Sequence, residues 1–444
     1  MPLFSWSRGK TGRTQSGAPA REVSRLAENP RVHKVFDWFL RHEREIADFQ
    51  MAITRVPAPF EAERKRADWL RQRLEGLGLN LSSDAVGNLL AVRAGSEKAV
   101  AENVPFVAIS AHLDTVFPAA TVLDVRREHA ILQGPGISDN GTGLAALWAV
   151  ATAFHEAGII TAAPLLFVAN VGEEGEGNLR GIRHLYRQGL ALEASAMEDS
   201  PAPQIAQLVA IDGAGAENII SQALGSRRFE ITITGPGGHA WSDHGTPNPL
   251  SAIALTAAGL SRIELPALPR TTLNLAMIEG GTSINSIPER AVLRVDMRSA
   301  ELQKLDEVER QMRRLVSEAC HEVELKAQNS RGSLTTTICM IGERPAGELA
   351  SDSILLSALR AVDSQLGIKA QTLRASTDAN IPLSLGLEAV TLGGGGTGGG
   401  AHTLHEWFDP VGRDLGLRRI ALLVLLLAGL SPSVQTEDSA EEHS

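Results

Sequence analysis

The chain has 444 residues, 43% of them hydrophobic, which is long enough for more than one domain and a substantial core. Its 52 Asp and Glu residues outnumber its 42 Lys and Arg residues, giving a formal net charge of -10. This balance argues against a surface for nucleic acid or anionic membrane, because such surfaces need an excess of basic side chains. The two cysteines, Cys320 and Cys339, are too few for a disulfide framework and fit a reducing, cytoplasmic compartment.

The first 30 residues are predicted to be a disordered N-terminus. Residues 1–21 contain Arg and Lys but no acidic residue, and no apolar run of signal-peptide length follows them. A secretory signal is therefore not expected, although an organellar transit segment shares this composition. Residues 432–444 are acidic and are expected to form a disordered tail.

Residues 31–224 alternate between amphipathic stretches and short apolar runs, which predicts the first part of an α/β catalytic domain. The predicted helices cover 32–56, 61–78 and 144–158, and the predicted strands cover 89–94, 104–114 and 165–174. Continuous apolar strands between helices indicate a sheet that is covered on both faces. Polar chemistry in such sheets gathers at the carboxyl ends of the strands.

The pattern changes near residue 225, and residues 225–341 predict a separate, inserted domain. Their predicted order is strand, helix, strand, strand, helix, strand, which is the ferredoxin-like order. The α/β pattern resumes in 342–431, where the apolar run 420–430 is too short to span a bilayer and predicts a buried helix. The predicted fold class is therefore α/β, with a three-layer catalytic domain and an inserted ferredoxin-like α+β lid domain.

Five residues of metal-binding types follow apolar runs or lie in glycine-rich turns: His112, Asp139, Glu174, Asp212 and His402. Imidazole and carboxylate groups suit zinc, and two ions need about this many ligands if one carboxylate bridges them. Each residue alone has a simpler explanation. Asp139 in SDNGTG, for example, also fits an ordinary turn at the start of a helix.

Further carboxylates accompany two of these residues. Asp114 lies two positions after His112, so both side chains of a strand would point to the same side, where Asp114 could accept the second ring N–H of the histidine. Glu173 and Glu174 are adjacent at a predicted strand end. This arrangement allows one to bind metal while the other acts as a general base toward water.

The order and spacing of these residues resemble a di-zinc family of exopeptidases and deacylases. The family includes peptidase T, carboxypeptidase G2, acetylornithine deacetylase, succinyl-diaminopimelate desuccinylase and aminoacylase. The resemblance runs from about residue 32 to 431 and includes GPGGHA (235–240), GGTSINSIPERAVLRVDMRS (280–299) and STDAN (376–380). The IDG and GGHAWSD segments look most similar to the peptidase T-like branch.

The resemblance implies a zinc-exopeptidase-type fold with two Zn²⁺ ions per subunit, which Co²⁺ or Mn²⁺ could replace. Asp139 would bridge the ions, and Glu173 would be the general base while Asp114 orients a histidine. The remaining ligands would be His112, Glu174, Asp212 and His402.

The resemblance also implies residues that contact the substrate. His239 is similar to the histidine that, in dimeric members, reaches the active site of the partner subunit and steadies the developing oxyanion. The inserted domain would then carry the contact of a homodimer. Asn285 and Arg298 match positions near the substrate, and Arg344 offers a fork for a substrate carboxylate.

Three positions leave alternatives open. His405 could ligate instead of His402, although Glu406, four residues after His402, favours His402. Glu198 or Asp199 could stand in for Asp212 because related enzymes place this ligand nearer Glu174. Asp378 fits either a position behind the ligands or a helix cap.

We therefore expect a zinc-dependent hydrolase of amide bonds, and the leading hypothesis is an exopeptidase of short peptides. A deacylase of N-acyl amino acids is the alternative, and an inactive metal-binding interaction protein is the third. The sequence does not distinguish an aminopeptidase from a carboxypeptidase. No nucleic-acid or membrane partner is expected.

Overall fold

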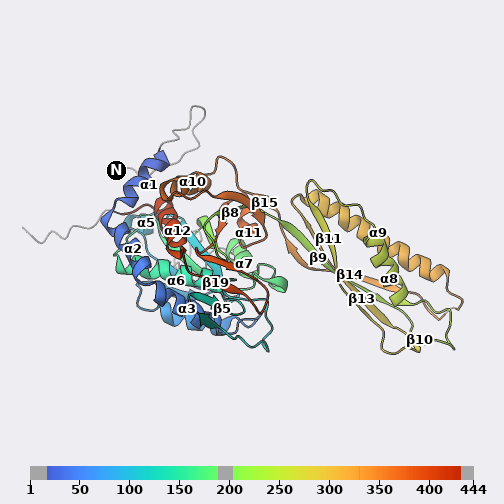
Figure 1. Cartoon of the computed structure of the whole chain (residues 1–444). Coiled ribbons are helices and arrows are strands. Elements are labelled where there is room, and N and C mark those ends of the chain that lie inside the picture. Colours follow the sequence, from blue (N-terminus) through green and yellow to red (C-terminus); the bar gives the residue numbers. More distant parts are fainter. Residues whose placement is uncertain (1–17, 189–203, 330, 432–444) are drawn as a thin grey trace, which may run out of the picture.

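The computed structural model describes residues 18–188, 204–329 and 331–431, and they form a catalytic domain and an inserted domain (Figure 1). The helices of the catalytic domain are α1 (Ala18–Ala27), α2 (Pro30–Arg41), α3 (Glu43–Thr54), α4 (Arg64–Leu74), α5 (Glu97–Ala101), α6 (Gly141–Glu156), the short 3-10 helix η1 (Gly175–Gly177), α7 (Arg180–Gln188), α10 (Ile354–Leu366), α11 (Asn380–Ser384) and α12 (Arg413–Ala428). Its strands are β1 (Asn80–Ser83), β2 (Leu89–Arg93), β3 (Phe106–His112), β4 (Arg126–Glu128), β5 (Ile131–Gln133), β6 (Leu165–Asn170), β7 (Ile205–Ile211), β8 (Asn218–Ala223), β15 (Gly347–Glu348), β16 (Gln371–Ala375), β17 (Glu388–Leu392), β18 (Thr397–Gly399) and β19 (Trp407–Asp409).

A nine-stranded sheet forms the centre of the catalytic domain. Its strand order is β1-β2-β6-β3-β7-β17-β8-β15, and β16 also pairs with β8. The four central strands β6, β3, β7 and β17 are mutually parallel, whereas β2 and β8 flank them in the antiparallel direction. The carboxyl ends of the central strands therefore lie together at one edge of the sheet.

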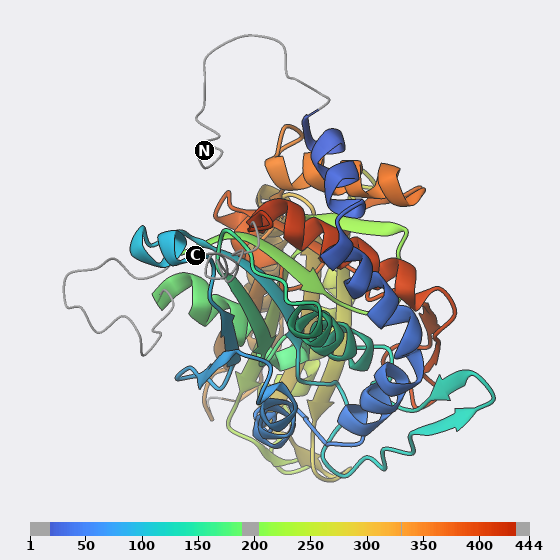
Figure 2. The same ribbon diagram turned by 90° about the vertical axis from the view of Figure 1, so that its left-hand side faces the viewer.

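Helices cover the central strands so completely that every residue of β3 and β6 is buried. Helices α6 and α12 pack on β3 and β7, and α1 and α2 contact α12 from outside. Figure 2 shows this face of the sheet, with α12 (red) beside the N-terminal helices (blue). This burial explains why the sequences of these strands are continuously apolar, as expected for parallel strands.

The predicted helix 32–56 is wrong as a single element because the chain breaks at His42. His42 leaves the helical conformation (φ -106°, ψ 18°), and its ring stacks on Trp38. Glu43 and Glu45 then occupy the first turn of α3, where negative charge stabilises a new helix N-terminus. Periodicity alone did not show this break, since both helices turn apolar residues toward the same core.

Two other boundaries differ from the sequence-based predictions. Residues 18–27 form α1, whereas the prediction placed residues 1–30 in a disordered segment; Val23 and Leu26 of α1 are buried, and α1 packs on α10 and α12. Helix α12 begins at Arg413 rather than near 420, and its first two turns bury the charged residues Arg413 and Arg419 beside Leu417. Residues 1–17 and the predicted acidic tail 432–444 lie outside the described residues.

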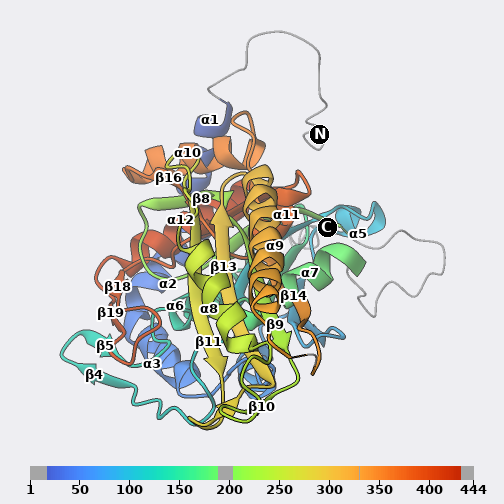
Figure 3. The ribbon, with the colours of Figure 1, turned by 90° about the vertical axis from the view of Figure 1, so that its right-hand side faces the viewer.

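The inserted domain consists of β9 (Gly225–Thr234), β10 (Gly238–His239), α8 (Pro249–Leu260), β11 (Thr271–Gly280), β12 (Ser286–Ile287), β13 (Arg290–Ser299), α9 (Leu302–Leu325) and β14 (Thr335–Arg344). Its antiparallel sheet has the order β11-β13-β9-β14, which is the ferredoxin-like arrangement of the predicted elements. Helices α8 and α9 lie on one face of this sheet (Figure 3) and enclose a separate apolar core. The sheet extends to Arg344, three residues beyond the predicted boundary at 341.

No helix among residues 18–188, 204–329 and 331–431 combines the length and apolar character needed to cross a membrane.

A buried ion pair joins helices α10 and α12, and we expect its loss to lower the free energy of unfolding. Arg419 is fully buried and binds Asp363 through two bonds, Nε to Oδ1 at 2.6 Å and Nη2 to Oδ2 at 2.8 Å. Asp363→Asn would leave the guanidinium buried without its counter-ion, so we expect a loss of about 3–5 kcal/mol in the free energy of unfolding. Denaturant titration measures this loss.

The matched control is Asp414→Asn on α12, because Asp414 pairs with Arg418 at a partly exposed site. That variant should lose at most about 1 kcal/mol. Equal losses in both variants would contradict the importance of the buried pair.

Candidate metal centre

The predicted ligands converge at the carboxyl edge of the four parallel strands. His112 is the last residue of β3, Asp212 directly follows β7, and Glu174 lies just after β6. His402 lies in the glycine-rich segment after β17, and Asp139 lies in the loop that enters α6. Residues that are far apart in sequence thus meet because parallel strands end at the same edge.

Asp139 lies between the two histidines. Its Oδ1 is 3.1 Å from Nε2 of His112, and its Oδ2 is 3.1 Å from Nε2 of His402. Nε2 of His112 is also 3.6 Å from Oδ1 of Asp212, while Nε2 of His402 is 2.9 Å from Oε1 of Glu174. The five side chains therefore form two groups that share Asp139.

These separations fit a pair of zinc ions. Two ligand atoms bound to one tetrahedral zinc at about 2.0–2.1 Å are about 3.3 Å apart. The distances of 2.9–3.6 Å within each group bracket this value. Single ligand atoms of His112, Asp139 and Glu174 also all lie within 4.8 Å of one another. The donor set, imidazole nitrogen with carboxylate oxygen, is one that zinc prefers.

The electrostatics of the site favour positive charge at two places. Burial would lower the pKa of His112, but its acidic neighbours outweigh burial and hold that pKa well above its usual value. Hydrogen bonds to Asp139 and Glu174 raise the pKa of His402 to about 10. Burial works against ionisation of Asp139, yet the two imidazoles hold its pKa below the usual range. Cations between these carboxylates would satisfy the same field.

The carboxylate of Glu406 holds the loop that carries Asp139 by accepting hydrogen bonds from its main chain. The buried carboxylate of Glu406 accepts bonds from the backbone N–H groups of Gly136 (2.8 Å), Ser138 (2.7 Å) and Asp139 (2.6 Å). On the other side, Asn140 caps α6 by accepting from the N–H of Gly143 at 2.9 Å. A Cβ on Gly143 would lie 2.5 Å from the carbonyl oxygen of Ile211, so only glycine permits this close approach.

The Asp114 carboxylate lies closer to the glutamate loop than to His112. Its two oxygens accept from the N–H of Glu173 (3.0 Å) and of Glu174 (2.7 Å). Nδ1 of His112 lies 3.0 Å from the main-chain oxygen of Asp114 and 3.7 Å from its carboxylate, so the carbonyl is the acceptor that orients the ring. This differs from the sequence-based expectation, in which the carboxylate orients the imidazole.

Glu173 is buried beside the ligands and pairs with Arg344. Nη1 of Arg344 lies 2.9 Å from Oε1 of Glu173. Burial raises the pKa of Glu173 well above the usual carboxyl value, and Arg344 partly opposes this rise. Arg344 is thus placed on the predicted general base, whereas the sequence suggested a contact with substrate.

Asp378 is buried near His112, and its Oδ1 accepts from Nδ2 of Asn170 at 3.0 Å. Burial raises the pKa of Asp378 to about 7, and the nearby carboxylate of Asp212 adds to the rise. Helix α11, which follows Asp378, begins without a side-chain cap.

The other predicted substrate contacts lie on the inserted domain. His239 on β10 and Asn285 beside β12 lie together, since the N–H of Ala240 bonds to the main-chain oxygen of Asn285 at 2.9 Å. Figure 1 shows β10 at the end of the inserted domain that points away from the catalytic domain. Arg298 of β13 binds Asp296 at 2.8 Å. None of these three residues has a hydrogen bond or ion pair to the ligand residues described above.

The structure also bears on the open alternatives. Both His402 and His405 are exposed, but Nε2 of His402 faces Glu174 and Asp139, whereas the backbone N–H of His405 bonds to Oγ1 of Thr403. Glu198 and Asp199 lie outside the described residues. Asp212, the ligand favoured by the sequence, lies 3.6 Å from Nε2 of His112.

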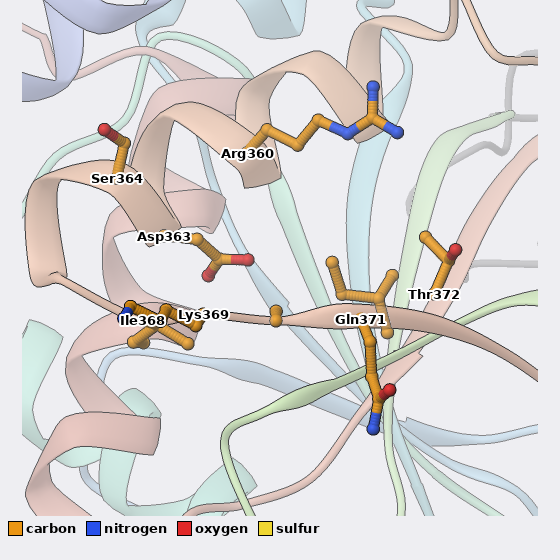
Figure 4. Close-up of a pocket in the computed structure, with 9 residues that line it drawn as sticks. Arg360, Asp363, Ser364, Ile368, Lys369, Gln371 and Thr372 are labelled. Atoms are coloured by element: carbon orange, nitrogen blue, oxygen red, sulfur yellow. The ribbon is translucent and has the colours of Figure 1, made fainter.

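A surface pocket of about 510 Å³ lies apart from these residues, near the C-terminal end of α10 (Figure 4). It is lined by Arg360, Asp363, Lys369, Gln371 and neighbouring residues. None of its lining residues is a predicted ligand or catalytic residue.

Sequence reasoning missed two supporting groups, the clamp by Glu406 and the pairing of Arg344 with Glu173. Glu406 carried a usable signal, since an acid four residues after a ligand histidine stands in a glycine-rich segment. The partners Arg344 and Glu173 belong to different domains, and no local pattern connects them.

Two family models match the chain. A model described as Peptidase family M28 matches residues 88–232, which include His112, Asp139, Glu173, Glu174 and Asp212. A model described as Peptidase dimerisation domain, of the M20 type, matches residues 223–324 of the inserted domain.

Curated proteins from Bacillus subtilis resemble parts of the chain. The uncharacterized protein YqjE is 22% identical over 300 residues, which cover 65% of this chain and 75% of that protein. An N-acetylcysteine deacetylase is 30% identical over 91 residues, only 20% of this chain and 24% of the enzyme.

Solved structures share the fold over most of the chain. A tripeptidase from Staphylococcus aureus has a TM-score of 0.68 at 20% identity and covers 87% of this chain and 98% of its own. The aminopeptidase PepT from Bacillus cereus has a TM-score of 0.66 at 18% identity, covering 87% and 99%. The YxeP protein of Bacillus subtilis, a dinuclear metal binding peptidase of the M20 family, has a TM-score of 0.60 at 16% identity, covering 87% and 99%. At these identities the likeness is one of fold.

The position of Asp139 between two groups of ligands predicts how metal content responds to substitution. Asp139→Ala should reduce bound zinc from about two ions per chain to less than about one, because each ion loses a shared ligand. His402→Ala should retain about one ion, since the His112 group stays intact. Elemental analysis of dialysed protein measures both.

The control is Asp68→Ala, because Asp68 is exposed on α4 and distant in sequence from every ligand. It should bind as much zinc as the wild type. Retention of both ions by Asp139→Ala would contradict a bridging role.

Proposed function

We propose that this hydrolase, which matches a Peptidase family M28 model over residues 88–232 and a Peptidase dimerisation domain model over residues 223–324, is a di-zinc exopeptidase of short peptides. One observation carries the proposal: Asp139 lies between His112 and His402 at the sheet edge where the buried Glu173 also lies. This arrangement brings candidate metal ligands and a candidate base to one site, which hydrolysis of an amide requires.

Two groups of residues would hold the ions. His112 and Asp212 would hold one, Glu174 and His402 would hold the other, and Asp139 would bridge them. Bound zinc would supply a water that is nucleophilic at neutral pH and would polarise the carbonyl of the scissile bond. Cobalt or manganese would suit the same nitrogen and oxygen donors.

Glu173 would move the protons of the reaction. Its carboxylate is adjacent in sequence to the ligand Glu174, and burial raises its pKa toward the range in which a carboxylate is an effective base. It would take a proton from the attacking water and deliver it to the nitrogen of the leaving amine. One group can serve in both steps because its protonated form persists between them.

His239 would act in a homodimer formed through the inserted domain. Its Nδ1 accepts from the N–H groups of Trp241 (3.2 Å) and Ser242 (3.3 Å), so a neutral ring carries its proton on Nε2. That Nε2–H is free of these bonds and would donate to an oxyanion in the partner's site. The distance of β10 from its own catalytic domain in Figure 1 supports a role in the partner rather than in the same chain.

Short peptides are the first choice of substrate because the tripeptidase and PepT share the fold over most of the chain. Asn285 and Arg298 of the inserted domain would then contact the peptide. The match to N-acetylcysteine deacetylase favours N-acyl amino acids as the second choice. An inactive interaction protein is disfavoured because Glu173 and all five ligand residues are present.

A substrate panel separates these choices. We expect purified protein with added Zn²⁺ or Co²⁺ to cleave dipeptides or tripeptides with a free terminus faster than N-acetylated amino acids. Peptides blocked at one end or the other identify the terminus that is recognised. A preference for N-acyl amino acids would favour the deacylase, and a protein that binds two metals yet cleaves no amide would contradict both.

Removal of the base gives a second prediction. Glu173→Gln should lower kcat by about 10²–10⁴-fold, because proton transfer by a positioned carboxylate contributes a factor of this size. Bound zinc should stay at the wild-type level, since Glu173 is not a proposed ligand. Loss of zinc from this variant would assign Glu173 to the ligands and refute its role as base.

A further inference from the structure

We propose that Arg344 is a positioning residue for the general base: it ties Glu173 to the root of the inserted domain and holds its carboxylate at the metal site. The proposal rests on the function proposed above, in which Glu173 transfers protons. It assigns to Arg344 a role different from the recognition of a substrate carboxylate.

The contacts of Arg344 fix both ends of Glu173. Nη1 donates to Oε1 of Glu173 at 2.9 Å, and Nη2 donates to the main-chain oxygen of the same residue. Nη1 also donates to Oγ of Ser376 at 3.0 Å. A planar guanidinium that holds the side chain and the backbone of one residue leaves that residue few other rotamers.

Arg344 is also where the inserted domain returns to the catalytic domain. It is the last residue of β14, and the N–H of the preceding Glu343 donates to Oδ1 of Asn178 at 3.0 Å. From β9, the other connecting strand, Arg228 donates to the main-chain oxygen of Gly175. Both connecting strands of the inserted domain therefore form hydrogen bonds to the loop that carries Glu173 and Glu174.

The same junction is fastened on its other side by Asn380. Its Nδ2 donates to the main-chain oxygens of Leu224, just before β9, and of Pro345, just after β14, both at 2.9 Å. Its Oδ1 accepts from the N–H of Thr377 at 2.9 Å. The position of Arg344 is thus set by the catalytic domain and by both connecting strands together.

The bonds of Arg344 occupy its end-on fork, the pair of terminal nitrogens. Bidentate binding by arginine uses two parallel N–H groups, and here both terminal nitrogens are bonded to Glu173. Arg344 is 6% exposed, and its remaining Nε is buried. A substrate carboxylate could take this end-on fork only by displacing Glu173, and the Nε–H, which has no partner among the described residues, is enclosed within the protein.

Two variants of Arg344 test the proposal. Arg344→Gln should lower kcat by about 10²-fold with little change in KM, because a misplacement of about 1 Å of a catalytic group costs this much. Arg344→Lys should recover part of the loss, since an ammonium keeps the charge but cannot hold both oxygens. Zinc content and thermal unfolding are measured on each variant to separate misplacement from loss of metal or fold.

Arg183→Gln is the matched control. Arg183 joins α7 to the same junction, through the main-chain oxygens of Asn178 and Glu343, but does not touch Glu173. Its kcat should stay close to that of the wild type. An equal loss in this variant would mean that any loosening of the junction lowers activity, which overturns the specific role of Arg344.

Two further measurements distinguish positioning from substrate binding. Combining Arg344→Gln with Glu173→Gln should lower kcat no further than Glu173→Gln alone, because the base is already absent. Peptides with a free carboxylate and their amides should lose activity equally in Arg344→Gln. An increase in KM confined to the free carboxylates would overturn the proposal in favour of a substrate contact.

A crystal structure of Arg344→Gln tests the contact without an assay. We expect the Glu173 side chain to leave its wild-type position while Glu174 and the histidines stay in place. An unmoved Glu173 would overturn the positioning role even if activity fell. If the wild-type protein cleaves no amide, the proposed function fails, and this structural comparison still decides whether Arg344 positions Glu173.

Discussion

The crowding of carboxylates at one edge of the central sheet is the constraint on which the rest of the structure depends. Asp139, Glu174 and Asp212 lie within hydrogen-bond range or nearly so of the same two histidines. Two like charges about 4 Å apart repel by about 4 kcal/mol at an effective dielectric constant of about 20. Positive charge among its members relieves this repulsion, and the same carboxylates raise the pKa values of His112 and His402.

Backbone N–H donors hold the loops that carry these crowded carboxylates. Glu406 and Asp114 are not predicted ligands. Each accepts hydrogen bonds from backbone N–H groups of a loop that carries a predicted ligand. Because a carboxylate bonded to successive N–H groups fixes the direction of that backbone, it also fixes where the next side chain points. The glycine-rich segments serve the same end, since side chains there would block the approach of one loop to another.

Local sequence patterns predicted the strands because each strand depends on neighbours in the chain, whereas the ligand set was predicted from the order and spacing of distant residues. Continuous apolar runs predicted β3 and β6, and the residue types at their ends predicted His112 and the pair Glu173 and Glu174. The break at His42 was not predictable from periodicity, since the apolar residues on either side keep nearly the same spacing.

Local sequence patterns also could not predict which residues of the catalytic domain pair with residues of the inserted domain. Arg344 had a suitable side chain for an anion, but which anion it meets depends on how β14 re-enters the catalytic domain. The ligand assignments themselves remain predictions that the geometry supports, because the roles of side chains around an ion depend on the ion as well as on the fold.

The point of insertion gives the inserted domain a direct influence on the chemistry. Were its two connections to enter at a remote edge, motion of the domain would change only the access of substrate. Instead, Arg228 and Arg344 bind the main chain of the loop that begins at Glu173, so a rotation of the domain about its root must strain or release that loop. If Glu173 is the base, as proposed, movement of the inserted domain on closure over a substrate would change the placement of that base through these same bonds.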